Sequence, residues 1–151
     1  MAQRSDDATQ WMRPVIVNAQ SSLPVDLRRM MRLARCAIRR LRIRTQGTFE
    51  ITFVSAARMQ TLNRTFMGHN RPTDVLSFRY DGEPVIGEIL IAPSAARTYA
   101  RCHGLAYEAE LSRYVVHGLL HWLGHEDRTT QQRARMRVME DQLLNRCRAG
   151  G

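Results

Sequence analysis

The stretch YEAELSRYVVHGLLHWLGHED, residues 107–127, carries the strongest fold signal in this chain. Over residues 107–123 its apolar side chains recur every three to four positions, which predicts an amphipathic helix. Because such a helix needs cover for its apolar side, we expect one face of a β-sheet to pack against it. The residues expected to face the core are Leu111, Tyr114, Val115, Leu119 and Trp122.

Two histidines lie on this helix at a spacing that suits a metal ion. His117 and His121 stand at positions i and i+4, so their side chains project from one face about one turn apart. Gly124 follows where a left-handed residue can end a helix and turn the chain back toward the same metal. A lone HxxxH pair also occurs by chance on ordinary helices, but the glycine turn with a further ligand after it favours a metal site.

The third ligand has two candidates, His125 and Asp127. In metzincin-type zinc enzymes the last ligand stands three residues after the glycine, and this spacing favours Asp127. A carboxylate oxygen is an acceptable ligand for Zn²⁺, and His125 stays the alternative. Three protein ligands with an open fourth position predict a catalytic site that holds one Zn²⁺ per chain and hydrolyses its substrate with metal-activated water.

A zinc peptidase is the first alternative, and one position argues against it. Peptidases of the HExxH type need a glutamate directly after the first histidine as the general base. This chain has Gly118 there. Another residue, or the metal alone, must then activate the water.

The charge of the chain points to a phosphate-bearing substrate. All 23 basic residues are arginine, against 14 acidic residues, and the formal net charge is +9. Guanidinium groups pair with phosphate oxygens two at a time, and a strongly basic protein attracts polyanions. A GC-rich genome also produces many arginines, so composition alone does not decide between the two explanations.

The run from Arg28 to Arg44 is more specific than the composition. It places eight arginines on one helix and its exit. Because the apolar residues between them form a buried stripe, the arginines must face water or a ligand. The predicted stripe is Leu27, Met31, Leu33, Ala34, Ala37, Ile38 and Leu41, and the predicted RNA-binding residues are Arg28, Arg32, Arg35 and Arg39.

The length and the remaining composition predict one soluble domain. At 151 residues the chain is long enough for one hydrophobic core, so we expect a single domain over 1–151 with residues 1–12 flexible. No segment has the length and apolarity of a membrane span, and the start lacks a signal peptide, which predicts a cytoplasmic protein. Cys36, Cys102 and Cys147 are odd in number and form no CxxC, which predicts reduced core thiols rather than a disulfide.

The hydrophobic periodicity alternates between strand and helix along the chain. Thr48 to Val54 shows the clearest strand pattern, with Phe49, Ile51 and Phe53 on one face. The order β-α-β-α-β-β-α-α-α predicts an α+β fold, in which about four strands form a small mixed sheet and about five helices cover it. The predicted strands are 15–19, 48–54, 74–78 and 85–91, and the predicted helices are 22–41, 55–62 (capped by Ser55), 93–104, 107–123 and 130–146.

Three motifs, in this order along the chain, resemble the YbeY family of bacterial endoribonucleases and rRNA maturation factors. They are LNRTFMGHNRPTDVLSF at 62–78, GEILIAP at 87–93 and HGLLHWLGHED at 117–127, and RMRVMEDQLL near the C-terminus is similar to the family's last segment. The resemblance implies a zincin-like metal helix and a zinc-dependent endoribonuclease that acts on single-stranded RNA in the cytoplasm. It also implies roles in maturing the 3′ end of small-subunit rRNA and in ribosome quality control, with the ribosomal small subunit and assembly factors as partners.

Carried over by position, His117 and His121 match the family's first two zinc histidines. The family usually has a third histidine where this chain has Asp127, which is a change of ligand type. The family also has an arginine where this chain has Met67, and Arg64 and Arg71 are the nearby candidates to replace it.

Glu88 is a further candidate, because the family usually has an acid at this strand position. We therefore consider it for general-base work or for supporting a metal ligand. Three functions remain open: a zinc-dependent endoribonuclease, an rRNA- or ribosome-binding assembly factor whose zinc is structural, and a zinc peptidase. Neither DNA nor a membrane is an expected partner.

Overall fold

The structure of the protein is a computed structural model that describes residues 11–67, 75–81 and 84–149. The α+β class predicted from the periodicity is confirmed, because a four-stranded sheet carries five helices within these residues. The elements are β1 (Arg13–Ala19), α1 (Leu27–Arg40), β2 (Thr48–Val54), α2 (Ala56–Met67), β3 (Val75–Arg79), β4 (Val85–Ile91), α3 (Pro93–His103), α4 (Tyr107–Trp122) and α5 (Thr130–Ala149).

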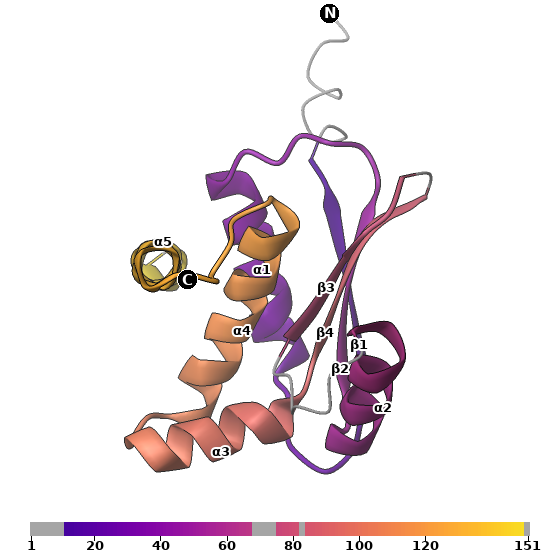
Figure 1. Cartoon of the computed structure of the whole chain (residues 1–151). Coiled ribbons are helices and arrows are strands. Elements are labelled where there is room, and N and C mark those ends of the chain that lie inside the picture. Colours follow the sequence, from indigo (N-terminus) through magenta and orange to yellow (C-terminus); the bar gives the residue numbers. More distant parts are fainter. Residues whose placement is uncertain (1–10, 68–74, 82–83, 150–151) are drawn as a thin grey trace, which may run out of the picture.

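The sheet is mixed and has the strand order β1-β2-β4-β3. β1 pairs with β2 in parallel, β2 pairs with β4 in parallel, and β3 closes the sheet as an antiparallel edge strand beside β4. Figure 1 shows α1 and α4 on one side of this sheet and α2 on the other. Both faces of the central strands are therefore covered, as parallel pairing requires.

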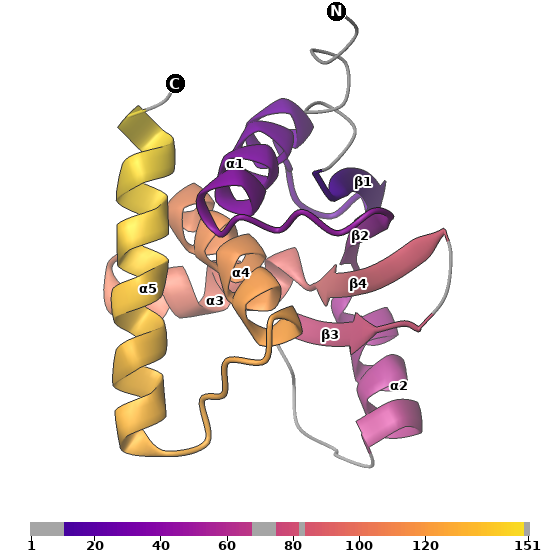
Figure 2. The same ribbon diagram turned by 90° about the horizontal axis from the view of Figure 1, so that it is seen from above.

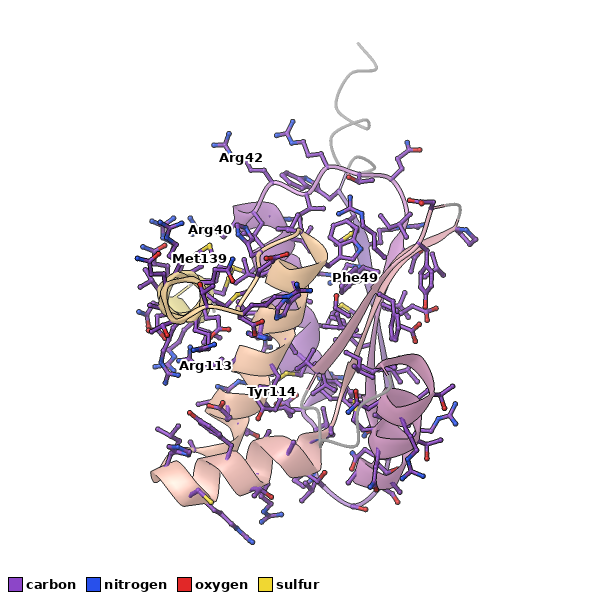
Figure 3. All side chains as sticks on the ribbon, in the orientation of Figure 1. Arg40, Arg42, Phe49, Arg113, Tyr114 and Met139 are labelled. Carbon is purple, nitrogen blue, oxygen red and sulfur yellow. A yellow bond between two sulfur atoms is a disulfide. The ribbon has the colours of Figure 1, made fainter. Side chains whose placement is uncertain are left out.

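The main core lies between the sheet and the pair α1 and α4. Phe49, Ile51 and Phe53 alternate along β2, and all three are fully buried against this side, which confirms the predicted strand face. Figure 3 shows Phe49 directed from β2 toward the helices. A smaller cluster under α2 covers the other face of the sheet and includes Leu76 of β3 and Leu90 of β4.

α5 packs on the outer side of α4 and α1. Val116 and Leu120 of α4 meet Met136 and Leu143 of α5 in a third apolar cluster. Figure 2 shows α5 running alongside these two helices. Among the helices that the structure describes, none combines the length and apolarity that crossing a membrane requires.

The helix boundaries follow the capping residues rather than the first turn-forming residues. α1 begins at Leu27 and not near Ser22, because the Asp26 carboxylate accepts a hydrogen bond from the Arg29 N–H at 3.1 Å. Leu27 is 40 % exposed and is not part of the buried stripe, whereas Met30, which the pattern missed, is 1 % exposed. The predicted Ser55 cap of α2 is confirmed by its hydrogen bond from the Arg58 N–H.

The prediction of three reduced core thiols is wrong. Cys36 of α1 and Cys147 of α5 form a disulfide with a Cα–Cα distance of 5.7 Å, and Cys102 is exposed. The two helices lie side by side, so residues 111 positions apart in the chain come within bonding range. Sequence spacing carries no signal for such a pair.

Candidate metal centre

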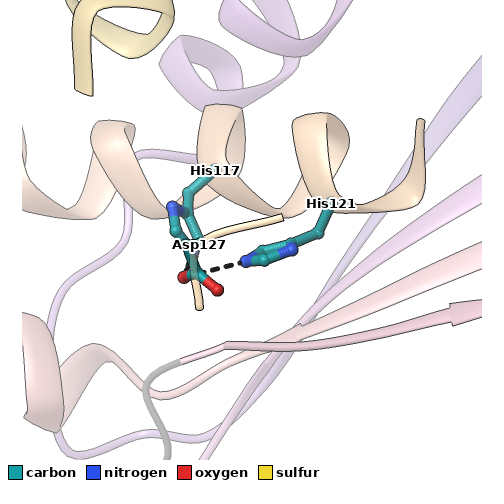
Figure 4. Close-up of side chains that lie close together, drawn as sticks. All are labelled: His117, His121 and Asp127. Atoms are coloured by element: carbon teal, nitrogen blue, oxygen red, sulfur yellow. Dashed lines mark hydrogen bonds and ion pairs between the residues drawn. The ribbon is translucent and has the colours of Figure 1, made fainter. Parts of the chain in front are cut away.

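The end of α4 and the turn after it bring the candidate ligands together. The turn is a Schellman motif, in which the Gly124 N–H donates to His121 O and the His125 N–H donates to Leu120 O. Gly124 has a φ of 102°, in the left-handed half of the map where a glycine is favoured. This turn reverses the chain and places Asp127 against the two histidine side chains of α4 (Figure 4).

The three side chains form a compact donor set. Asp127 Oδ2 lies 3.2 Å from His121 Nε2 and 3.4 Å from His117 Nε2. Ligand atoms of His117, His121 and Asp127 all lie within 4.8 Å of one another, so this group could hold a metal ion. The side chains are 25 %, 28 % and 37 % exposed in that order, which leaves the group accessible to a substrate.

Among the described residues, His125 is not part of this donor set. Its backbone N–H is used by the turn and its side chain is exposed. The geometry therefore favours Asp127 over His125 as the third ligand.

A buried carboxylate that sequence analysis missed supports the first histidine. Glu140 of α5 is 4 % exposed, and its Oε2 accepts a hydrogen bond from His117 Nδ1 at 2.5 Å. With Nδ1 as the donor, His117 carries its lone pair on Nε2, the atom that faces Asp127. A carboxylate that holds the far nitrogen of a metal-binding histidine is the common arrangement in metalloproteins.

Arg113 contacts the other oxygen of the Glu140 carboxylate and holds this carboxylate in place. It donates to Glu140 Oε1 at 3.0 Å and to Asp141 Oδ1 at 2.7 Å. Burial alone would lower the pKa of the Arg113 guanidinium, but the hydrogen bonds to Asp141 and Glu140 raise it above its ordinary value. The buried Glu140 carboxylate is therefore balanced by a permanent cation.

The residue after the first histidine lies against the sheet. A Cβ atom added at Gly118 would lie 2.8 Å from Cδ1 and 2.9 Å from Cγ2 of Ile89 in β4, closer than packed atoms approach. Ser77 of β3 also donates a hydrogen bond to the Gly118 carbonyl oxygen. The glutamate that an HExxH peptidase carries at this position would therefore require Ile89 to shift.

The structure does not bring Glu88 to the candidate ligands. In β4, Ile89 faces α4, so Glu88 points to the opposite face of the sheet, where its carboxylate accepts a hydrogen bond from the Tyr80 hydroxyl at 2.8 Å. Burial, followed by the hydrogen bond and charge of Glu88, raises the pKa of Tyr80 to about 12. The role proposed for Glu88 beside the metal does not fit this placement.

The remaining predicted residues are separated from the three ligands or lie outside the described part. Arg64 is exposed on α2, the helix on the other face of the sheet. Arg71 lies outside the described residues, as does the side chain of Met67. The arginines Arg28, Arg32, Arg35 and Arg39 are all exposed on α1.

α1 lies on the side of α4 that is turned away from the ligand atoms. Val116 and Leu120 of α4 pack with Leu33 of α1, whereas His117 and His121 project toward Asp127 (Figure 4). An RNA strand that contacts the arginines of α1 would therefore touch a different part of the surface from the donor set.

Comparisons with known proteins show which proteins this chain is similar to. A family model described as endoribonuclease YbeY matches residues 15–148. An endoribonuclease YbeY from Chlorobaculum tepidum is 36% identical over 103 residues, which are 68% of this chain and 75% of the relative. One from Acidothermus cellulolyticus is 32% identical over 145 residues, covering 86% of this chain and 88% of the relative.

The fold is also found in a solved structure. The solution structure of a Thermotoga maritima protein matches with a TM-score of 0.60 and 25% sequence identity. The match covers 90% of this chain and 93% of that protein.

Proposed function

The chain belongs to the endoribonuclease YbeY family, and from this premise we propose that it is a zinc-dependent endoribonuclease acting as one domain. The observation that carries the proposal is the donor set of His117, His121 and Asp127 at the open end of α4. Two imidazole nitrogens and one carboxylate oxygen suit Zn²⁺, and three protein ligands leave a fourth position for chemistry. When bound, the metal supplies an activated water and a Lewis acid for a phosphoryl oxygen.

The residues around the donor set fix its geometry. Glu140 keeps His117 in one tautomer and one orientation, so Nε2 is available without rearrangement. Asp127 contributes one oxygen to the donor set. Because residue 118 is a glycine that lies against Ile89, α4 has no glutamate base next to His117, and this argues against a peptidase of the HExxH type.

The identity of the RNA substrate is inferred from the family rather than from the geometry of the site. We propose single-stranded RNA as the substrate, in particular the 3′ end of small-subunit rRNA, with the ribosomal small subunit and its assembly factors as partners. An assembly factor with a structural zinc is the second candidate. It is favoured by Met67 and Asp127 of this chain, which stand where the resemblance implies an arginine and a third histidine.

We propose the cytoplasm as the compartment, and the disulfide offers a test of that proposal. Cytoplasmic thiols are normally kept reduced, so in that compartment the Cys36–Cys147 disulfide of this structure should be open, and both thiols should react with a thiol reagent when cells are lysed directly into denaturant. Protection of both thiols would contradict a reducing compartment.

A cleavage assay tests the proposed function. Purified protein is incubated with a single-stranded and a duplex RNA of the same sequence, with and without a chelator, and its zinc content is measured. We expect about one Zn²⁺ per chain and cleavage of the single strand, which the chelator abolishes.

Two variants complete this assay. His121→Ala should lose both zinc and cleavage, whereas His103→Ala, which removes an exposed histidine of α3, should keep both. If zinc-replete protein binds RNA without cutting it, the protein is an assembly factor and not an enzyme. Cleavage by metal-free His121→Ala protein would overturn the metal mechanism altogether.

A further inference from the structure

A second surface feature lies between β1 and α1, away from the donor set. It is a pocket of about 420 Å³ whose lining includes Trp11, Arg13, Arg35, Arg39 and Thr48, and we call it the basic pocket. Its lining, drawn from the described residues, contains three arginines and no acidic residue. The charge of this lining favours a negatively charged ligand.

The arginines of the basic pocket are not engaged by the protein itself. In the part of the chain that the structure describes, no carboxylate forms an ion pair with Arg13, Arg35 or Arg39. Elsewhere the chain does pair its arginines, as Arg29 does with Glu108 at 2.6 Å. The guanidinium groups of the basic pocket are thus available to an external anion.

The same arginines continue along one face of α1. Arg28, Arg32, Arg35 and Arg39 are spaced by four, three and four positions, so they form one exposed stripe. A stripe of this kind can contact successive phosphates of an extended strand, with Arg35 and Arg39 at the pocket. The ligand is therefore expected to be a polyanion rather than a single phosphate.

An aromatic side chain in the basic pocket narrows the class of polyanion. Trp11 is partly buried against the main core, and the Arg44 guanidinium lies 4.9 Å from the centroid of its ring. Indole rings and guanidinium planes are the surfaces on which unpaired bases stack. Polyphosphate would use the arginines alone, whereas a single-stranded nucleic acid would use the arginines and Trp11 together.

We propose that the basic pocket is a second RNA-binding site, separate from the metal centre, that holds a nucleotide of a single-stranded segment. A base stacks on Trp11, and the flanking phosphates pair with Arg35, Arg39 and Arg13. The pocket anchors the RNA at a distance from the donor set, so it contributes to binding rather than to the cleavage step. This inference rests on the proposed function for the choice of RNA as the polyanion.

The first test measures binding without cleavage. In the His121→Ala background, the affinity for an oligouridylate of about ten nucleotides is followed against salt concentration. Arg35→Glu with Arg39→Glu should weaken binding more than about 10-fold and make the slope of log K against log salt shallower by roughly 1.4, at about 0.7 per lost contact. The milder pair Arg35→Gln with Arg39→Gln should show the same trend, and its fold is checked by circular dichroism.

A matched control separates the pocket from general charge. Arg135→Glu with Arg146→Glu makes the same change in net charge at two exposed positions of α5. This pair should weaken binding less than about 3-fold, since long-range attraction is screened by salt. Equal losses for the two pairs would overturn the proposal. Unchanged RNA binding in the Arg35 and Arg39 variants would also overturn the proposal. An acidic protein would then be the expected partner of this surface.

The second test reports on the aromatic side chain. The chain has two tryptophans, and Trp122 is buried, so quenching of fluorescence by the oligonucleotide should come from Trp11. Trp11→Phe should remove the quenching and keep most of the affinity, whereas Trp11→Ala should weaken binding about 10-fold. Inorganic polyphosphate should bind Trp11→Ala as well as the parent. Equal loss of both ligands would mean that Trp11 supports the fold and does not stack on a base.

The two proposals can fail separately. If the protein does not cleave RNA but the oligonucleotide still depends on Arg35, Arg39 and Trp11, the second site stands and the proposed function fails. If cleavage depends on His121 while the pocket variants bind and cleave as the parent does, the proposed function stands and the second site fails. In the active protein, the Arg35 and Arg39 variants should raise KM for a long RNA and leave kcat unchanged.

Discussion

The candidate metal centre and the basic pocket are built in opposite ways. In the metal centre each group is held by the next: His117 by Glu140, Glu140 by Arg113, and Arg113 by Asp141. In the basic pocket the arginines are exposed and no carboxylate of the described chain pairs with them. Metal binding at the candidate centre depends on the fixed positions of its side chains. Anion binding at the basic pocket depends on the number of arginine charges.

This difference determines how each region should respond to substitution. Where a buried network sets the geometry, loss of one member leaves another polar group without its partner, and the cost is concentrated. Where exposed charges act on a polyanion, each substitution removes a similar fraction of the attraction. The changes below test this contrast from the largest expected effect to the smallest.

Replacing the third ligand should have the largest effect. Asp127→Ala removes a donor of the metal group, and we expect zinc affinity to fall by more than about 100-fold, the upper end for loss of an outer supporting residue. His125→Ala should keep the metal, and Asp127→His should bind zinc at least as well as the parent. Metal titration by competition with a chelator measures all three. Metal loss in His125→Ala with retention in Asp127→Ala would move the third ligand to His125.

Weakening the support behind His117 should have the next largest effect. Glu140→Gln keeps the shape of the side chain but removes the negative charge beside His117 Nδ1, so zinc affinity should fall about 10- to 100-fold. Asp141→Asn is the matched control, because it removes an exposed carboxylate from the other side of Arg113. It should leave zinc affinity unchanged. If both variants lost the metal equally, the charge of the cluster and not the hydrogen bond to His117 would be responsible.

The packing of α4 on the sheet predicts an effect on stability. An alanine at a mid-helix glycine normally stabilises by about 1 kcal/mol, but at Gly118 the added Cβ meets Ile89, and we expect a loss of roughly 1–3 kcal/mol. Urea unfolding gives the free energy. Ile89→Val should cost less in the Gly118→Ala background than alone, since it removes Cδ1, the nearest of the Ile89 atoms that the added Cβ meets. Additive effects would show that the helix shifts freely on the sheet.

The smallest effect is expected in the basic pocket. Arg35→Ala and Arg39→Ala each remove an exposed side chain without a described carboxylate partner, so the free energy of unfolding should change by no more than about 0.5 kcal/mol. The same urea experiment measures it. A loss as large as that of Gly118→Ala would mean that the arginines stabilise the fold and are not held ready for a ligand.

Local spacing predicted the features that lie within one stretch of chain. His117, His121 and Asp127 fall within eleven residues, and helix geometry with one glycine turn brings them together. The alternation of Phe49, Ile51 and Phe53 likewise follows from strand geometry alone.

Features that depend on how distant segments pack were not visible in the sequence. Glu140 comes from a helix 23 residues after His117, and the Cys36–Cys147 bond joins residues 111 apart. For Glu88, strand alternation predicts that it points away from Ile89, but only the packing of α4 shows which of these two faces carries the metal centre. The contact of Glu140, the disulfide and the orientation of Glu88 all follow from how the helices and the sheet pack together.

The contact between Gly118 and Ile89 also limits what this scaffold can become. Two of the glycine codons are a single base change from a glutamate codon, so mutation readily supplies the residue that would create an HExxH sequence. A side chain at position 118 would force the buried Ile89 to shift, because an added Cβ would lie 2.8 Å from Cδ1 and 2.9 Å from Cγ2 of Ile89. A smaller side chain at position 89 should reduce this cost, so a selection experiment toward peptide hydrolysis should acquire the change at position 89 before the change at position 118.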